Sequence, residues 1–468
     1  MGWTREEILT ATGGEMMQQG REVYFREVVT DSRRAGKGSV FIALEGNRLD
    51  GHAFVADAVG RGASCLVVRK KADTSRFLKK TTVIQVQDTL RALGELAHYR
   101  RQKVSPKVLA ITGSNGKTTT KEMIAAILGR ASVYGSRLSG KVLKTEGNYN
   151  NLVGLPLTLL RLQGRERVAV VELGTNAPGE IRRLTEIADP DIGLITSVAP
   201  AHLTGLGSLA GVAREKGELF LRMTPKGTAI VNLDDPWTRR LGKSFKGEKI
   251  TYGNNGEVRG ENRRVLGEKG TEFTLWAGGE RRRIRLRLSG ECNLSNALGA
   301  AAMAYGLGVD LESMRKGLES VRPVPMRMVT ERWKGIGIIN DAYNANPASM
   351  EAALKTLADI RVKGKRAVIL GDMLELGSES IKSHLELGKK VARHHIDRLY
   401  LLGQYALHVK EGALLEGMAE ERVRIGRGHR ELADRLREHT KRGDWLLFKG
   451  SRGLGMEKVL AAFKKIGD

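Results

Sequence analysis

The stretch VLAITGSNGKTTTKEMIAAILG, residues 108–129, decides the fold. Its apolar run VLAIT predicts a buried strand, and TTTKEMIAAILG has the apolar spacing of a helix. Between them, Gly113 and Gly116 permit a tight turn whose backbone N–H groups can point at phosphate oxygens, and the start of the helix adds a favourable dipole. We therefore predict a strand, a phosphate-binding loop and a helix, in which Lys117 neutralises the outer phosphates of ATP and Thr118 holds Mg²⁺.

The loop departs from the usual phosphate-loop spacing. The pattern G-x-x-x-x-G-K-[ST] would place glycine or alanine at Ile111, so the sequence indicates a subclass. A glycine-rich turn without a ligand is the alternative. The strand before the loop, the helix after it and the register of GKTT favour ATP binding. The predicted nucleotide contacts of the loop are Gly113, Ser114, Asn115, Gly116, Lys117, Thr118 and Thr119.

The same alternation of strand and helix organises most of the chain. A chain of 468 residues is too long for one ordinary core, and we predict an α/β protein of three domains, at residues 1–103, 104–321 and 322–468. The first is a small α/β domain. The second has a mostly parallel sheet built from VLAIT, RVAVVELG, DIGLITSV and GTAIVNL, with an antiparallel insertion between 250 and 290. The third is doubly wound and Rossmann-like, with strands RAVILGD, DRLYLLG and DWLLFKG.

The charge of the chain is strongly positive. It holds 78 Lys and Arg against 53 Asp and Glu, which gives a net charge of +25 and raises the hypothesis of nucleic-acid binding. The excess is spread along the chain, and RRRIRLRL at 281–288 alternates as a strand with one wet face would. A solvated surface is therefore favoured over a nucleic-acid groove. A basic protein also attracts polyanionic small substrates.

The cysteine spacing and the hydropathy of the sequence exclude several classes of protein. Cys65 and Cys292 lie far apart and outside any C-x-x-C pair, which argues against a disulfide framework and a structural zinc site. Cys65 lies in an apolar run and is expected in the core. Neither a membrane-spanning run nor a secretory leader is visible, so we expect a cytoplasmic protein, and we expect a monomer.

Further motifs extend over nearly the whole chain. They are DSR at 31–33, ALEGNRLDGHAF at 43–54, TEGNYNNLVGLPLTLL at 145–160, VELGTNAPGEI at 171–181, HLTGLGS at 202–208, AREKGELF at 213–220, CNLSNALGAA at 292–301, DAYNANPASM at 341–350, LGDMLELG at 370–377 and KGSRGLGME at 449–457. In this order, and together with TGSNGKTT, they resemble the motifs of the Mur ligase family, which includes the folylpolyglutamate synthetases.

The resemblance implies an ATP-dependent ligase that forms an amide bond through an acyl phosphate. DAYNANPASM and GDMLELG are similar to the member that adds D-alanyl-D-alanine to UDP-N-acetylmuramoyl-tripeptide, so these are the expected substrates and the pentapeptide precursor of peptidoglycan is the expected product. The DNPR sequence typical of the preceding ligase is absent. Another amide ligase of the family, of the tripeptide-forming or folylpolyglutamate type, is the first alternative. A nucleotide-dependent nucleic-acid binder is the second.

The resemblance also implies a catalytic set. Glu172 and His202 match the Mg²⁺ ligands of the family, beside Thr118, and the residue that matches Lys216 carries a carbamate made from CO₂. Carbamylation turns a cation into an anion that can orient a metal among phosphates. Taken alone, Glu172 also suits a salt bridge, His202 a helix cap and Lys216 a solvated surface. Arg327 matches the interdomain arginine near the γ-phosphate, where fixed cations offset charge repulsion.

The remaining candidates follow from the same motifs. Asn293 and Asn296, one helical turn apart, are implied at the adenine base and Asp341 at the ribose, with helix capping as the alternative for the asparagines. The implied contacts with the uridine and its pyrophosphate are Ser32, Arg33, Asn47 and His52, those with the sugar-peptide arm are Thr145, Asn148, Asn150 and Asn151, and those with the dipeptide are Asn344, Asn346 and Asp372. Asx turns are the alternative for such Asn-rich stretches. Lys449 and Arg452 suit phosphate or carboxylate contacts, and His384 is expected on the surface.

Overall fold

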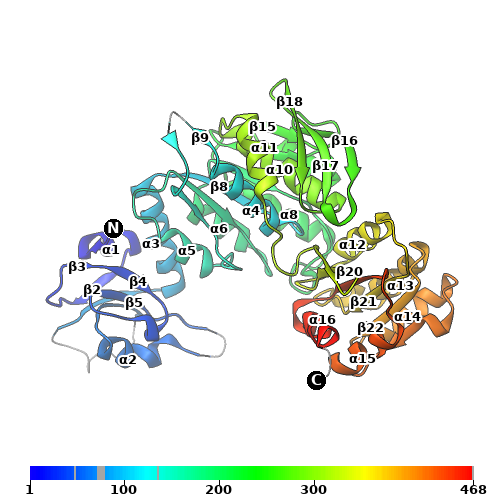
Figure 1. Cartoon of the computed structure of the whole chain (residues 1–468). Helices are drawn as coiled ribbons and strands as arrows, with labels where there is room; N and C mark the ends of the chain where they lie inside the picture. Colours follow the sequence, from blue (N-terminus) through cyan, green and yellow to red (C-terminus); the bar gives the residue numbers. More distant parts are fainter. Residues whose placement is uncertain (47–48, 71–79, 134–135, 466–468) are drawn as a thin grey trace. The chain divides into compact units, whose positions relative to one another are not determined.

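The computed structural model describes residues 1–46, 49–70, 80–133 and 136–465 (Figure 1). The chain forms two compact units. Unit 1 comprises Met1–Ala110, Gly140–Gly174 and Arg182–Asp191, and unit 2 comprises Ile111–Ser139, Thr175–Ile181 and Ile192–Asp468. Within the described ranges, no helix has the length and apolar character needed to cross a membrane. The two boundaries expected from the sequence between its three domains stay a prediction.

Unit 1 begins with a five-stranded sheet, blue in Figure 1. Its order is β2 (Glu15–Gln18), β7 (Thr82–Val86), β6 (Ala63–Arg69), β5 (Ser39–Ile42) and β4 (Glu27–Val29), with β4 to β7 parallel and β2 antiparallel to β7. Two short strands, β1 (Trp3–Thr4) and β3 (Tyr24–Phe25), form a separate antiparallel pair.

Helices cover both faces of this sheet, which explains why its parallel strands are mostly apolar rather than alternating between apolar and polar residues. Core residues of α1 (Arg5–Thr12) and α3 (Thr89–Val104) pack on one face, and those of α2 (Val55–Gly60) pack on the other. Successive side chains of β5 point to opposite faces of the sheet. Val40 lies in the first core, with α1 and α3, and Phe41 lies in the second core, with α2. Cys65 is fully buried in the first core, as predicted.

The mostly parallel sheet predicted for the middle of the chain is present. Its six strands have the order β11 (Val142–Lys144), β12 (Val168–Glu172), β8 (Lys107–Thr112), β13 (Ile192–Ile195), β14 (Thr228–Asn232) and β15 (Glu248–Tyr252). The pairs β11–β12, β13–β14 and β14–β15 are parallel. In unit 1, α5 (Gly154–Leu159) connects β11 to β12, and α6 (Glu180–Ala188) follows β12 in the chain.

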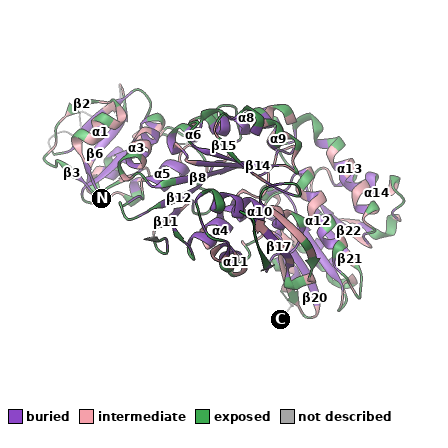
Figure 2. Cartoon of the chain, turned by 90° about the horizontal axis from the view of Figure 1, so that it is seen from above, coloured by how far each residue is buried: buried purple, intermediate pink, exposed green. Residues whose placement is uncertain are grey.

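In unit 2, helices lie on both sides of β13, β14 and β15. Figure 2 shows α8 (Leu209–Arg222) and α9 (Pro236–Ser244) on one side, with α4 (Lys117–Leu128), α10 (Glu291–Gly306) and α11 (Leu311–Ser320) on the other. Asp235 caps α9 by accepting from the backbone N–H groups of Trp237 and Thr238, and Pro236 occupies the first turn, where its missing N–H has no cost. The short α7 (Leu203–Leu206) precedes α8, and β9 (Ser132–Val133) pairs with β10 (Ser136–Arg137).

The predicted antiparallel insertion is a three-stranded sheet. It consists of β16 (Arg259–Val265), β17 (Thr271–Ala277) and β18 (Glu280–Leu286) in that order. The alternation predicted for RRRIRLRL is confirmed, because Arg283 and Arg285 are exposed while Ile284 and Leu286 are buried. These arginines therefore form one wet face of the sheet.

The last part of unit 2 is the predicted doubly wound domain. Its sheet has the order β19 (Val329–Trp333), β20 (Ile336–Asp341), β24 (Trp445–Lys449), β21 (Arg366–Gly371), β22 (Arg398–Leu402) and β23 (Val423–Ile425), and only β19 is antiparallel to its neighbour. The helices are α12 (Pro347–Asp359), α13 (Ser380–Arg393), α14 (Ala406–Leu415), α15 (His429–His439) and α16 (Glu457–Lys464). Strands β21, β22 and β24 were predicted, and β19, β20 and β23 are additional.

Candidate active site

The glycine-rich loop has the predicted geometry. Strand β8 ends at Thr112 and helix α4 begins at Lys117, with Gly116 as its N-cap. Gly113 has a φ of 145° and Gly116 a φ of 84°, which L side chains rarely adopt. A β-carbon at Gly113 would lie 1.9 Å from Thr196 Oγ1, so glycine is required there for space as well as for conformation. The Lys117 ammonium folds back and donates to the Gly113 carbonyl at 2.6 Å.

The segment after β13 holds this loop in place. Thr196 Oγ1 donates to the carbonyl of Asn115 at 2.5 Å, and the Ser114 N–H donates to the carbonyl of Ser197 at 2.8 Å. Ser114 Oγ donates to the carbonyl of Ala199 at 2.9 Å. These bonds preorganise the loop backbone. Thr196 carried no signal in the sequence beyond its place at a strand end.

Three basic side chains of unit 2 influence one another beside the loop. His202, the N-cap of α7, donates from Nδ1 to Glu375 Oε2 at 2.5 Å. Burial lowers the pKa of His202, Glu375 raises it, and Lys117 and Lys216 lower it further. Lys216, on α8, is 1% exposed, and burial together with the charge of Lys117 holds the pKa of its amine well below the usual value. Lys216 is therefore not the solvated lysine that was its alternative.

Glu215, next to Lys216, was missed by the sequence analysis. Its buried carboxylate accepts from the backbone N–H groups of Gly179 at 2.8 Å and Ile181 at 2.7 Å, and from Thr175 Oγ1 at 3.3 Å. These bonds, all within unit 2, fix residues 175–181 against α8. Glu215 also raises the pKa of Lys216, although less than burial lowers it.

In unit 1, the predicted residues Thr145, Asn150 and Glu172 meet at the end of β12. The Glu172 carboxylate is 2% exposed and accepts from Asn150 Nδ2 at 2.9 Å, while the Glu172 N–H donates to Thr145 Oγ1 at 3.0 Å. Asn151 instead accepts from the N–H groups of Val153 and Gly154 at the start of α5, which is the Asx role left open for it. Asn148 is exposed.

The two asparagines proposed for the adenine base have different surroundings. Asn293 is buried and its amide donates to the carbonyl of Ser289 at 2.8 Å. Asn296 lies against the glycine-rich loop, because a β-carbon at Gly116 would be 2.2 Å from Asn296 Oδ1. Thr118 and Thr119, in the first turn of α4, are each 8% exposed.

The candidate binding residues of the last domain of unit 2 lie in two places. Asn346 contacts the glycine-rich loop, and Asp341 and Lys449 lie at the ends of β20 and β24. Asn346 caps α12, and its Nδ2 donates to Asn115 Oδ1 of the glycine-rich loop at 2.9 Å. Asp341 forms an ion pair with Lys449 at 2.5 Å, and Lys449 also donates to the carbonyl of Asn344 at 3.0 Å. Lys449 is 2% exposed, and the ion pair with Asp341 compensates the charge of its buried ammonium group. The Arg327 guanidinium lies 3.9 Å from the centre of the Tyr343 ring.

The surface position expected for His384 is wrong. Its side chain is completely buried, stacks on Tyr405 at 4.5 Å between ring centres, and donates from Nδ1 to the carbonyl of Ser380 at 2.7 Å. Its Nε2 accepts from the Met373 N–H at 3.0 Å. Both ring nitrogens are thus satisfied, which makes burial of the neutral ring possible, and burial lowers the pKa of His384.

Asp372 is the anchor of a neighbouring turn. Its carboxylate accepts from the backbone N–H groups of Gln404 at 2.8 Å and Tyr405 at 3.2 Å. Gly403 permits this approach, since a β-carbon there would lie 2.3 Å from the Asp372 carboxyl carbon. The role of Asp372 in binding the dipeptide stays a prediction.

The N-terminal candidates lie around two Asx motifs of unit 1. Asp31 caps Ser32–Arg34, and its hydrogen bonds from the Arg33 side chain and backbone lower the pKa of Asp31 to about 2. Ser32 is buried, whereas the Arg33 side chain is exposed. Asn47 lies outside the described residues.

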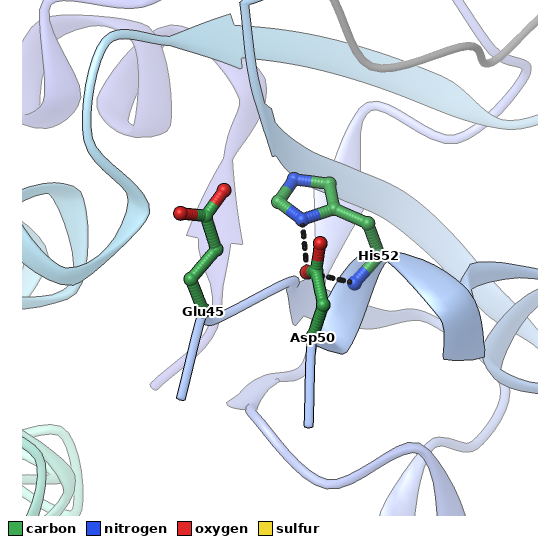
Figure 3. Close-up of side chains that lie close together, drawn as sticks. All are labelled: Glu45, Asp50 and His52. Carbon is green, nitrogen blue, oxygen red and sulfur yellow. Dashed lines mark hydrogen bonds and ion pairs between the residues drawn. The ribbon is translucent and has the colours of Figure 1, made fainter. Parts of the chain in front are cut away.

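His52 belongs to a cluster with Glu45 and Asp50 (Figure 3). Across the described ranges, it is the one set of three carboxylate or histidine side chains whose possible ligand atoms lie within 4.8 Å of one another. His52 Nδ1 bonds to Asp50 at 2.7 Å and its Nε2 accepts from the Arg69 N–H at 3.0 Å, while Glu45 pairs with the Arg69 guanidinium at 2.6 Å. Both ring nitrogens are occupied, so protein contacts alone account for the cluster.

Comparison with known proteins places these residues in a family. Three protein-family models match the chain: "Mur ligase family, catalytic domain" at residues 25–101, "Mur ligase middle domain" at 111–304 and "Mur ligase, glutamate ligase domain" at 326–452. The chain is 36% identical over 471 residues to the UDP-N-acetylmuramoyl-tripeptide–D-alanyl-D-alanine ligase of Escherichia coli (strain K12), covering 99% of each chain. It is 35% identical to the ligase of that name from Bacillus subtilis (strain 168), covering 94% of each chain.

Solved structures agree with this relationship. A crystal structure of MurF from Acinetobacter baumannii has a TM-score of 0.90 at 33% identity, with 99% of each chain covered. MurF ligase from Thermotoga maritima in complex with ADP has a TM-score of 0.81 at 28% identity, with 94% of this chain and 97% of that chain covered. The α/β fold predicted from the sequence is thus shared with these enzymes.

Proposed function

The chain belongs to the Mur ligase family, and we propose that it joins D-alanyl-D-alanine to UDP-N-acetylmuramoyl-tripeptide at the expense of ATP, giving the pentapeptide precursor of peptidoglycan. The observation that carries this proposal is the likeness, over 99% of both chains, to the E. coli ligase named for these two substrates. The motifs DAYNANPASM and GDMLELG favour the dipeptide-adding member over its relatives. The ADP complex of the T. maritima enzyme supports nucleotide binding by this chain.

The chemistry proceeds in two balanced steps. A carboxylate oxygen of the tripeptide attacks the γ-phosphorus of ATP, the bond to the β-phosphate oxygen breaks, and ADP leaves. The amine of D-alanyl-D-alanine then attacks the acyl carbon, and inorganic phosphate leaves with the former carboxylate oxygen while the amine loses a proton. The first step brings anions together, so the loop N–H groups and Lys117 must bind and orient the phosphates.

The residues fit the Mg²⁺ that the family implies. Thr118 and Glu172 offer oxygen donors, which Mg²⁺ prefers, and His202 offers a ring nitrogen. When bound, the metal would neutralise phosphate charge and polarise the reacting oxygens. Thr118, Glu172, His202 and Lys216 are our proposed ligands.

Lys216 would serve as a ligand through a carbamate. Its buried amine, with a pKa held low by burial and by Lys117, favours the neutral form, which is the form that adds to CO₂ and releases a proton. The carbamate would place a negative charge next to Lys117 and His202. It would thereby replace the charge of Lys216, which lowers the pKa of His202, by a charge of opposite sign, and it would turn the repulsion between Lys216 and Lys117 into attraction.

The other roles are carried over from the family. We propose Arg327 near the γ-phosphate, Asp341 at the ribose, and Asn296 with Asn293 at the adenine. We propose the uridine and sugar-peptide contacts at Ser32, Arg33, Asn47, His52, Thr145, Asn148, Asn150 and Asn151, and the dipeptide contacts at Asn344, Asn346 and Asp372. A cytoplasmic monomer that binds no nucleic acid completes the proposal.

The test is release of ADP in the presence of each substrate separately and of both together. We expect release to depend on both the UDP-linked tripeptide and D-alanyl-D-alanine. Release triggered equally by free amino acids would overturn the dipeptide assignment. Parallel assays of tripeptides ending in lysine and in diaminopimelate assign the third residue, and retention on DNA at physiological salt with DNA-stimulated turnover would favour the nucleic-acid alternative.

A further inference from the structure

The loop that carries Glu375 meets the loop that carries His202 at two points. His202 Nδ1 lies 2.5 Å from Glu375 Oε2, and the Thr204 N–H donates to the Glu375 carbonyl at 3.2 Å. Gly377 lies next to this contact, and its φ of 57° is one that L side chains rarely adopt. The two residues are 173 positions apart in the sequence, so the contact joins separate segments of unit 2.

Both residues adopt a backbone conformation that is costly for them. His202 has a φ of 54° and Glu375 a φ of 64°, in the left-handed region that non-glycine residues rarely occupy. Each such residue costs on the order of 1 kcal/mol or more, and such residues concentrate at functional sites. Here the side chains of the two residues contact each other. We infer that the unfavourable backbone conformations serve to hold this pair of side chains together.

The pairing fixes which ring nitrogen of His202 can bind a ligand. A carboxylate accepts hydrogen bonds only, so Nδ1 carries the proton and Nε2 keeps a lone pair. Metal-binding histidines in proteins are commonly held in this way, with one nitrogen bonded to a carboxylate and the other bonded to the metal. The His202 side chain is 24% exposed and that of Glu375 is 58% exposed, so the pair is reachable from solvent.

We propose that Glu375 is a positioning residue that holds His202 in the Nδ1-protonated tautomer and orients Nε2 toward the divalent metal. This inference rests on the proposed function, in which His202 is a metal ligand. It adds a residue from the last domain that acts on one of the four proposed ligands, Thr118, Glu172, His202 and Lys216. Glu375 acts through His202 and touches neither substrate nor metal.

The test is Mn²⁺ binding by the full-length protein, measured by electron paramagnetic resonance, in Glu375→Ala, Glu375→Asp and a control. We expect Glu375→Ala to weaken Mn²⁺ binding by about tenfold or more, the size of effect found when such a carboxylate is removed, and Glu375→Asp to restore part of it. Glu379→Gln, which removes an exposed carboxylate four residues along the same loop, should bind as the wild type does.

A double-mutant cycle separates positioning from a general loss of structure. In a His202→Ala background, Glu375→Ala should have no further effect on Mn²⁺ affinity, because its partner is gone. The ¹⁵N resonances of the His202 ring should show a protonated Nδ1 in the wild type and a mixture of tautomers in Glu375→Ala. Tighter Mn²⁺ binding by Glu375→Ala, equal effects in both backgrounds, or an unchanged ring tautomer would overturn the inference.

These measurements do not depend on the ligation assay. A wild-type protein that ligates normally while Glu375→Ala binds Mn²⁺ unchanged would refute the positioning role alone. A wild-type protein that fails to ligate would refute the proposed function, and the ring tautomer and Mn²⁺ affinity would still decide the role of Glu375.

Discussion

Replacing Lys216 by methionine should make the protein more stable and much less active. Methionine is similar in volume to lysine and apolar, so Lys216→Met fills the same space without burying an amine. The Lys216 side chain is 1% exposed, and its amine is subject both to burial and to the charge of Lys117. Burying a polar group at the expense of its hydration costs about 1–3 kcal/mol in proteins, and we expect a stability gain of that order.

The activity should move in the opposite direction. Loss of a group that stabilises charge in the transition state typically lowers kcat by about 10²–10³-fold. Stability is measured from the urea midpoint in CO₂-free buffer, and activity from ADP release. Lys226→Met is the matched control, because Lys226 is exposed in the turn that follows α8 and its replacement should change stability by less than about 0.5 kcal/mol.

Bicarbonate supplies the decisive comparison. A carbamate forms only on the folded wild-type site, so bicarbonate should raise the urea midpoint of the wild type and leave that of Lys216→Met unchanged. Full activity in Lys216→Met, or an equal response of both proteins to bicarbonate, would refute the role assigned to Lys216.

Three further predictions concern the loop, a buried histidine and the metal. Gly113→Ala should weaken ADP binding by about tenfold or more in calorimetric titration, because its β-carbon would meet Thr196 Oγ1 at 1.9 Å and the Thr196 nitrogen at 3.0 Å. Gly308→Ala, also at positive φ but with open space around it, is the control, and an equal affinity in both variants would contradict the steric argument. Burial lowers the pKa of His384, so the unfolded chain binds more protons than the folded one below about pH 6.5, and stability should fall as the pH drops below that value. His384→Gln should flatten this dependence of the urea midpoint, whereas the exposed His395→Gln should leave it as steep; identical slopes would argue against the assignment. EDTA should abolish ADP release and added Mg²⁺ should restore it, since the metal neutralises phosphate charge, and undiminished release in EDTA would exclude a metal requirement.

Features that depend on neighbouring residues were predictable from the sequence. The phosphate loop needs glycine at two positions between a strand and a helix, and the structure has the strand ending at Thr112 and the helix starting at Lys117. The alternation of arginine with Ile and Leu in β18 likewise predicted one solvent-exposed face and one buried face. By contrast, β20 pairs with β24, about a hundred residues later in the chain, and short-range patterns carry no information on such a pairing.

The motifs supplied the candidate residues of the site, whose roles stay predictions, whereas the contacts that support these residues could not be predicted. His202 could be singled out by its motif, but nothing in the sequence connects it to Glu375. The sequence analysis expected His384 on the surface because histidine is a polar residue. Only the folded chain brings the Ser380 carbonyl and the Met373 N–H to the two ring nitrogens of His384. Polar residues are buried when their partners are supplied by distant or irregular backbone, which periodicity does not reveal.

The acyl phosphate at the centre of this account can be tested with an isotope. The terminal carboxylate of the UDP-linked tripeptide is labelled with ¹⁸O, the protein is supplied with ATP and D-alanyl-D-alanine, and the inorganic phosphate is analysed by mass spectrometry. The account predicts one ¹⁸O atom in each phosphate released from fully labelled substrate, because the attacking carboxylate oxygen departs with the phosphorus. Phosphate free of label, together with normal formation of the pentapeptide, would contradict it.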